Sequence, residues 1–282
     1  MNRATSLNIQ RKSALADRVQ LLDGCPLPSW IDINITELCN RTCVFCPRTD
    51  PKVYPNQNLN MSVALARKIG TELRSIEYKG AVILSGFGEP LLHPRVVEVA
   101  RAVGRGLHLE LVTNGDSLTV RLIRELCEAG VKFFAVSMYD GPEQQGKLHS
   151  TFVQAGCTED VYLLRDRWHG PDTDFGLKLT NRAGTVASGN QPLVRSGCPC
   201  FYTAYSAMVD WDGGVLLCVQ DWNKKVRFGN LSGQSLVEVW TSSAFQKWRA
   251  RLARGDRSWA PCSGCNADGT VHGSNHVRAW NL

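Results

Sequence analysis

Three cysteines, Cys39, Cys43 and Cys46, stand within eight residues of one another, and their spacing constrains this chain more than any other feature. They supply three thiolates, one fewer than a closed tetrahedral zinc site or a fully ligated cubane cluster needs. A metal centre with three protein ligands keeps one coordination position open for a small molecule. The C-x3-C-x2-C spacing therefore predicts a reactive metal centre, and the alternative is a zinc site that a distant fourth ligand completes.

The composition excludes several other classes of protein. With 282 residues, 43% of them hydrophobic, the chain is long enough for one large domain or for one large and one small domain. No apolar run approaches the roughly 18 residues of a membrane span, and the first residues lack a signal peptide's apolar core. The net charge of +6 is scattered, so we expect no nucleic-acid binding. Eleven cysteines in what we expect to be a cytoplasmic protein indicate metal or redox chemistry.

Strand-like and helix-like segments alternate between residue 30 and about residue 183, after an amphipathic helix expected over 7–22. This alternation is typical of an α/β fold with parallel strands joined by helices, in which ligands bind at the carboxyl ends of the strands. The predicted strands are 30–35, 81–84, 107–112, 131–137, 161–165 and 176–180, and the predicted helices are 61–76, 94–103, 119–129 and one that ends near 155.

The character of the chain changes after residue 184. A linker is expected over 184–190, a β-hairpin over 207–219 and a helix over 236–253. We therefore divide the chain into a helical extension, a large α/β domain and a small C-terminal domain, with bounds 1–29, 30–185 and 186–282.

The second predicted strand ends in two glycines and a glutamate, Gly86, Gly88 and Glu89, with Phe87 between the glycines. Glycine lets a backbone approach a ligand closely, and the Glu89 carboxylate suits an ammonium group. Alone, this run is also what an ordinary strand-to-helix turn looks like.

Polar residues end the next strands as well: Thr113 and Asn114 follow the third, and Ser137 ends the fourth. Each also fits an ordinary turn. Arg165 lies on the fifth strand and Lys178 on the sixth, where a buried cation is costly unless it is paired. These two are expected to meet a bound anion, or else to form salt bridges within the protein, for Arg165 with Asp140 or Asp166.

The C-terminal cysteines form a second set. Cys200 and Cys218 bracket the predicted hairpin, and Cys262 and Cys265 form a C-x2-C pair beyond the predicted helix. Together they supply four thiolates, enough for a closed site, and a structural zinc ion is one occupant that would suit them. Cys198 is left over beside them.

Together these motifs resemble the radical S-adenosylmethionine (SAM) superfamily. In that family the fourth iron of a [4Fe–4S] cluster is chelated by the amino and carboxylate groups of SAM, and the loop around Cys39, Cys43 and Cys46, with Phe45, resembles its cluster motif. The Gly86 to Glu89 run resembles the family's Gly-Gly-Glu motif, which holds the methionine amino group, although Phe87 is an insertion. The resemblance implies a partial (β/α)6 TIM-like barrel.

The C-terminal cysteines resemble the shortened "twitch" form of the SPASM domain, which carries a second, fully ligated [4Fe–4S] cluster. The resemblance therefore implies two [4Fe–4S] clusters, SAM and an electron donor such as a flavodoxin or ferredoxin. It also implies that polar strand-end residues contact the ribose and carboxylate of SAM. The implied cofactor-binding residues are Phe45, Gly86, Gly88, Glu89, Thr113, Asn114, Ser137 and Arg165.

Small twitch-type members of the family tailor aminoglycosides and other sugar antibiotics. The resemblance implies that a 5′-deoxyadenosyl radical takes a hydrogen atom from a carbinol carbon of a sugar or aminocyclitol, oxidising a secondary alcohol to a ketone. By its position Arg182 is a candidate base for the oxidation, with an ordinary salt bridge as its alternative. Epimerisation at the same carbon, with Cys198 as hydrogen-atom donor, is the alternative reaction.

Two further alternatives change the substrate or the class of protein. Enzymes that modify ribosomal peptides often carry a recognition domain of about 80 residues, a whole small domain by size, and the 29 residues before the first strand are too few for one. A zinc-binding adaptor would use both cysteine sets structurally, but it leaves Gly88, Glu89 and the count of three thiolates unexplained.

Overall fold

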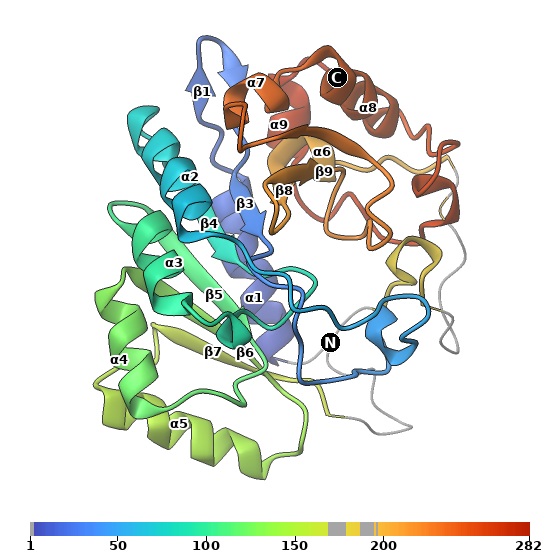
Figure 1. Cartoon of the computed structure of the whole chain (residues 1–282). Coiled ribbons are helices and arrows are strands. Elements are labelled where there is room, and N and C mark those ends of the chain that lie inside the picture. Colours follow the sequence, from blue (N-terminus) through green and yellow to red (C-terminus); the bar gives the residue numbers. More distant parts are fainter. Residues whose placement is uncertain (1–2, 169–178, 187–194, 196) are drawn as a thin grey trace.

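The computed structural model describes residues 3–168, 179–186, 195 and 197–282, and its centre is one mixed β-sheet (Figure 1). The strand order in this sheet is β10-β9-β8-β3-β4-β5-β6-β7. Five neighbouring strands run parallel, as the alternation of strands and helices predicts. They are β3 (Trp30–Ile33), β4 (Ala81–Leu84), β5 (His108–Thr113), β6 (Val131–Met138) and β7 (Tyr162–Asp166).

The helices between these strands confirm the predicted pattern to within a few residues. Ser62 and Thr119 cap two of them through side chains that accept from the first helical turn, and Gly156 ends another in a left-handed conformation. The helices are α2 (Val63–Ser75), α3 (Val96–Gly104), α4 (Val120–Glu128) and α5 (Glu143–Ala155).

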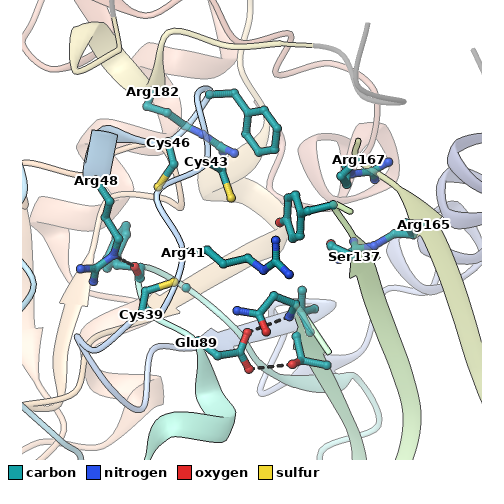
Figure 2. Close-up of a pocket in the computed structure, with 18 of the residues that line it drawn as sticks. Cys39, Arg41, Cys43, Cys46, Arg48, Glu89, Ser137, Arg165, Arg167 and Arg182 are labelled. Carbon is teal, nitrogen blue, oxygen red and sulfur yellow. Dashed lines mark hydrogen bonds between the residues drawn. The ribbon is translucent and has the colours of Figure 1, made fainter. Parts of the chain in front are cut away.

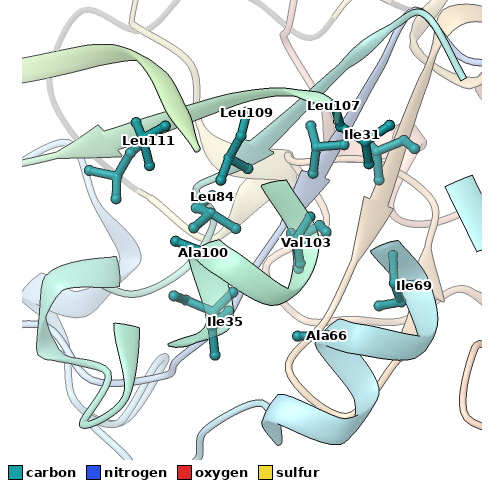
Figure 3. Close-up of a cluster of buried hydrophobic side chains, with 14 of the residues drawn as sticks. Ile31, Ile35, Ala66, Ile69, Leu84, Ala100, Val103, Leu107, Leu109 and Leu111 are labelled. Carbon is teal, nitrogen blue, oxygen red and sulfur yellow. The ribbon is translucent and has the colours of Figure 1, made fainter. Parts of the chain in front are cut away.

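The main core lies between this helix layer and one face of the sheet. Alternate strand residues such as Ile31, Leu84 and Leu109 point toward Ala66 of α2 and Val103 of α3 (Figure 3). Each fully buried leucine or isoleucine contributes about 1.5–3 kcal/mol relative to an exposed one. This layer holds the strands in register, so that their carboxyl ends meet along one edge.

The opposite face of the sheet is covered by α1 (Arg3–Ala16). Ala16 packs there with Trp30, Ala81 and Ile83, which alternate with the core residues along their strands. The predicted helix over 7–22 is wrong in its last part, because α1 ends at Ala16 and a short hairpin follows.

The two strands of that hairpin are β1 (Leu21–Leu22) and β2 (Cys25–Pro26). Asp23 and Gly24 join them with φ values of 49° and 80°. An Asp-Gly pair with positive φ is a favoured two-residue hairpin turn and stops a helix.

The C-terminal hairpin is confirmed, but it joins the same sheet. Its strands are β8 (Ser206–Val209) and β9 (Gly214–Leu216), followed by β10 (Arg227–Asn230). β8 pairs in parallel with β3, from Trp30 opposite Ser206 to Ile33 opposite Val209. The predicted domain bounds therefore stay a prediction, since one sheet runs through both cysteine-bearing parts.

The structure differs from the predicted last helix and does not describe most of the predicted sixth strand. The helix predicted over 236–253 is two helices, α7 (Leu236–Trp240) and α8 (Ser243–Ala253), because the Ser242 side chain accepts from Phe245 N and starts a new one. The sixth strand, predicted over 176–180, lies outside the described residues up to 178, and 179 and 180 are not in a strand. The last part of the predicted linker, 187–190, also lies outside them.

Short helices complete the described C-terminal part. In the described ranges, no helix has the length and apolar character needed to span a membrane. The short helices are α6 (Tyr202–Tyr205) and α9 (Ser274–Ala279).

Candidate active site

A cavity of about 320 Å³ opens at the carboxyl ends of the parallel strands, and we call it the strand-end cavity (Figure 2). Cys39, Cys43 and Cys46 line it, and so do all eight residues that the resemblance assigns to cofactor binding. Strand ends that are far apart in sequence therefore meet where the α/β pattern predicts a ligand site.

The three cysteines of the loop are partly exposed to this cavity. Burial raises the pKa of all three thiols. That of Cys43 rises to about 11, because the charges of Cys46 and Cys39 also disfavour its thiolate. A bound metal deprotonates its thiol ligands outright. The three thiols stand on one short loop that lines a common cavity, an arrangement that fits three ligands of a metal centre with one open position.

Arg41, inside the cysteine loop, ties this loop to the ends of two strands. Its guanidinium donates to Asp116 at 2.6 Å and to Asp140 at 2.8 Å, and it lies 5.0 Å from the centre of the Tyr139 ring. The hydrogen bonds from Arg41 to Asp140 and Asp116 hold its pKa well above the usual range. The sequence pattern did not single out this clamp, because its two partners lie 75 and 99 residues away.

Arg48 fixes the other side of the loop, and the sequence pattern did not predict this role either. This buried side chain donates to the carbonyl oxygens of Phe87 and Glu37, at 2.7 and 2.5 Å. An arginine just after the last cysteine is the only signal that the sequence offers for it.

The two glycines of the Gly86 to Glu89 run are required first by the chain itself. A Cβ on Gly88 would lie 2.1 Å from the Thr36 carbonyl oxygen, and Gly86 has a φ of 140° with Asn34 close by. The expectation that they admit a ligand is therefore incomplete. They also let the turn pack directly against the segment that leads into the cysteine loop.

Glu89 is buried and accepts three hydrogen bonds from its own protein. Its donors are the Thr113 hydroxyl at 2.6 Å, Asn114 N at 2.7 Å and Leu91 N at 3.0 Å. Burial raises the pKa of Glu89 to about 7, although these bonds favour the carboxylate. A carboxylate offers about four acceptor positions, so one remains for a ligand, and this fits an ammonium group.

Arg165 faces the same cavity from β7. Its Nη2 donates to the Ser137 hydroxyl at 2.8 Å, while its buried Nε has no hydrogen-bond partner. Burial lowers the pKa of Arg165 to about 9. Among the described residues it pairs with neither Asp140 nor Asp166, which favours the ligand alternative, while Lys178 lies outside the described residues.

The C-terminal cysteines are packed much more tightly. Cys200, Cys262 and Cys265 are each less than one-tenth exposed. Burial and the charges of the other three thiols raise the pKa of Cys218, so the four lie together. A Cβ on Gly269 would lie 2.2 Å from the Cys200 sulfur, so glycine keeps this space open beside the thiol. Four thiols that lie together, three of them buried, fit a fully ligated cluster.

Cys198 stands apart from this set. Its carbonyl oxygen accepts from Arg257 at 2.8 Å, and its side chain lines neither the strand-end cavity nor the cavity described next. The donor role predicted for Cys198 therefore gains no support from its position.

A second cavity, of about 340 Å³, adjoins the first on the sheet face under α1, and we call it the sheet-face cavity. Tyr202 and Val219 line it beside the C-terminal cysteines, and Tyr202 packs in the same cluster as Cys200. The two cavities together therefore extend from the first cysteine set to Tyr202, a side chain that packs in the cluster of Cys200. Both are lined by Gly86, Val112, Arg165, Arg182 and Trp222.

Arg182 lies where the two cavities meet. Its Nε is buried without a hydrogen-bond partner, and Trp222 Nε1 beside it is likewise unpartnered among the described residues. Arg182 and Ala183 have φ values of 46° and 53°, a conformation that costs a non-glycine residue about 1 kcal/mol or more. Strain and an orphaned donor at one residue are typical of a functional position.

Two protein-family profiles match the chain, and one curated relative matches most of its length. The radical SAM superfamily matches residues 33–161, and the SPASM iron–sulfur cluster-binding domain matches residues 198–266. An S-adenosyl-L-methionine-dependent 2-deoxy-scyllo-inosamine dehydrogenase of Niallia circulans is 28% identical over 244 residues, 84% of this chain and 92% of the relative.

Solved structures give the same result. The crystal structure of BtrN with AdoMet and 2-DOIA superposes with a TM-score of 0.73 and 25% identity over 89% of this chain and 98% of BtrN. The structure of anSMEcpe with AdoMet shares the fold, with a TM-score of 0.53 and 13% identity over 89% of this chain and 95% of that one. This chain therefore belongs to the radical SAM superfamily, as an oxidoreductase with a SPASM domain that uses SAM and two [4Fe–4S] clusters.

Proposed function

We propose that this protein oxidises a secondary alcohol of an aminocyclitol to a ketone. The observation that carries the proposal is the pair of adjoining cavities, of which one is lined by the three-cysteine loop and the other by Tyr202, which packs in the cluster of Cys200. A relative that matches 84% of the chain is a dehydrogenase of the aminocyclitol 2-deoxy-scyllo-inosamine. A substrate between the two sets can lose a hydrogen atom on one side and an electron on the other.

The protein's own residues bind and orient the reactants. SAM and the two clusters, when bound, supply hydrogen-atom abstraction and an acceptor for the remaining electron. Glu89 holds the ammonium group of SAM in the strand-end cavity, and Arg165 meets its carboxylate. Trp222 and Tyr202 wall the sheet-face cavity, which places the substrate carbon beside the first site and excludes water.

Arg182 is best suited to hold the substrate oxygen. A guanidinium stays protonated in proteins, so accepting a proton as a base is difficult for it. Its orphaned Nε lies at the junction of the cavities, and donation to the carbinol oxygen would satisfy it. We therefore favour the role of oxygen-binding donor over that of base.

Oxidation accounts for the structure better than epimerisation does. A hydrogen-atom donor has to reach the substrate radical, and Cys198 lines neither cavity in the described part of the chain. The second cysteine set adjoins the sheet-face cavity through Tyr202 and Val219. We further propose a cytoplasmic protein that receives electrons from a flavodoxin or ferredoxin, because the chemistry needs a low-potential donor and a reducing compartment.

The test is an incubation of the anaerobically reconstituted protein with SAM, dithionite and 2-deoxy-scyllo-inosamine in deuterated water. We expect a product lighter by two hydrogens and no deuterium bound to carbon at the reacting position. The Cys198→Ala variant should oxidise at the wild-type rate. An inverted carbon that carries solvent deuterium, lost in Cys198→Ala, would instead establish epimerisation.

A further inference from the structure

We propose that the N-terminal helix completes the substrate site, with Lys12 of α1 and Asp32 of β3 together binding a vicinal amino alcohol. Asp32 accepts from the substrate's ammonium group, and Lys12 donates to the neighbouring hydroxyl oxygen. The inference rests on the proposed function, because it names the part of an aminocyclitol that the sheet-face cavity recognises.

The helix α1 is fixed over the cavity from two sides. Arg11 forms an ion pair with the buried Glu110 of β5, and its guanidinium lies 4.2 Å from the centre of the Phe133 ring. On the other side, the Ser13 hydroxyl and His272 Nδ1 are 3.2 Å apart. Lys12 lies between these two anchors, so its side chain is held over the sheet.

Lys12 lines the sheet-face cavity, and its ammonium group lies 5.0 Å from the centre of the Trp30 ring. Burial lowers the pKa of Lys12, whereas the charge of Asp32 raises it. Within the described residues the ammonium group has neither a hydrogen-bond acceptor nor an ion-pair partner. An ammonium group that lines a cavity and forms only a cation–π contact keeps unused donors.

Asp32 lines the same cavity and is 6% exposed. The Ser85 hydroxyl donates to Asp32 Oδ1 at 2.7 Å, and burial raises the pKa of this carboxyl. In the described part of the chain, Asp32 and Lys12 do not form an ion pair with each other. The neighbouring residues Arg11 and Glu110 do form an ion pair across the same helix and sheet. The separation of Lys12 from Asp32 is therefore a feature of the cavity that the two residues line.

A buried carboxylate and a half-buried ammonium group that share a cavity without contact leave the charge of the carboxylate without its nearest counter-ion, which is costly. A ligand with a cationic donor next to a hydroxyl removes this cost by bridging them. Asp32 is the only carboxylate that lines the sheet-face cavity in the described ranges, beside the cations Lys12, Arg165 and Arg182. An ammonium group therefore has one favourable position there, and the hydroxyl oxygens face the cations.

The test compares 2-deoxy-scyllo-inosamine with its analogue in which a hydroxyl replaces the amine, using the reconstituted holoenzyme. Asp32→Asn should lower kcat/KM for the amine by about tenfold or more, the range for a lost charged hydrogen bond, and change kcat/KM for the analogue less than about twofold. Lys12→Met should lower kcat/KM for both compounds. Equal effects of Asp32→Asn on the two compounds, or none, would refute the assignment.

Matched controls are Asp160→Asn and Lys147→Met, which change the same residue types at exposed positions outside both cavities. They should match the wild type with both compounds. If the wild type oxidises neither compound, the proposed function fails, and binding of the amine to the SAM-loaded protein without reductant decides the inference alone. Tighter binding to the wild type than to Asp32→Asn supports it, and equal binding overturns it.

Discussion

The two cysteine sets differ in both number and enclosure. Cys39, Cys43 and Cys46 are partly exposed around a cavity that also holds Glu89 and several arginines. In the second set, three of the four cysteines are less than one-tenth exposed. Three accessible thiols suit a metal centre that binds a small molecule, whereas four thiols, most of them enclosed, suit one that only exchanges electrons.

The two sets are also joined by a buried polar network. Lys224 Nζ donates to Glu37 and to Asp210, each at 2.7 Å, and Glu37 also accepts from the Tyr54 hydroxyl at 2.6 Å. Glu37 lies two residues before Cys39, and Asp210 directly follows β8, in the hairpin that leads through β9 to Cys218. The network therefore links the backbone of one set to that of the other.

The largest effect should come from removing one thiol from either set. Cys43→Ala should abolish SAM cleavage, whereas Cys262→Ala should still cleave SAM to 5′-deoxyadenosine but form no ketone. Each variant should keep about four iron atoms where the wild type has about eight. Iron and sulfide analysis with product quantification checks both, and loss of SAM cleavage in both variants would contradict the division of roles.

Breaking the link between the sets should have the next largest effect. Lys224→Met removes the cation nearest to Glu37 and Asp210, with Arg48 and Arg227 remaining at 3.6 and 3.1 Å. Leaving buried carboxylates short of a partner should cost about 3 kcal/mol of unfolding free energy. Thermal or denaturant unfolding measures this, with the exposed Lys225→Met as its control, and equal stabilities of the two variants would refute the network's role.

The affinity for SAM should depend on pH through Glu89, which lines the strand-end cavity of the first cysteine set and not the sheet-face cavity. Burial raises the pKa of Glu89 in the folded protein from 4.5 to about 7. Without a ligand, the protonated carboxyl therefore stabilises the folded state below pH 4.5, and this contribution is lost as the pH rises through 7. An ammonium ligand needs the carboxylate, so binding weakens by up to about tenfold per pH unit below 7. Titrations at pH 6 and 8 test this, and Glu89→Gln should bind weakly at both.

The smallest effect should come from the Arg41 clamp. Arg41→Lys keeps the charge but loses the two-pronged bonds to Asp116 and Asp140. Because Asp140 is 57% exposed, the loss should be about 1 kcal/mol or less. The KM for SAM should rise roughly fivefold, and an unchanged KM would show that the loop needs no clamp.

Local patterns predicted the parallel strands and their helices, and together with the family resemblance they predicted the three cysteines and eight other residues that line the strand-end cavity. They failed where a single turn or cap overrode the periodicity, as at Asp23 and Gly24 after α1 and at Ser242 between α7 and α8. They also missed Arg41 and Arg48, because the partners of these arginines are distant in sequence or are backbone carbonyls, which every residue carries.

The sequence by itself determined which candidate ligands the chain offers and how many: three thiols after the first strand of the α/β domain, four in the C-terminal part, and Glu89 after two glycines. These depend on the covalent spacing of neighbouring residues, which no packing changes. Only the tertiary structure decided that β8 pairs with β3, that the strand-end and sheet-face cavities adjoin, and that Lys12 and Asp32 line the same cavity. Such contacts join residues as far apart as Lys224 and Glu37, 187 positions along the chain, and arise from packing the whole sheet under its helices.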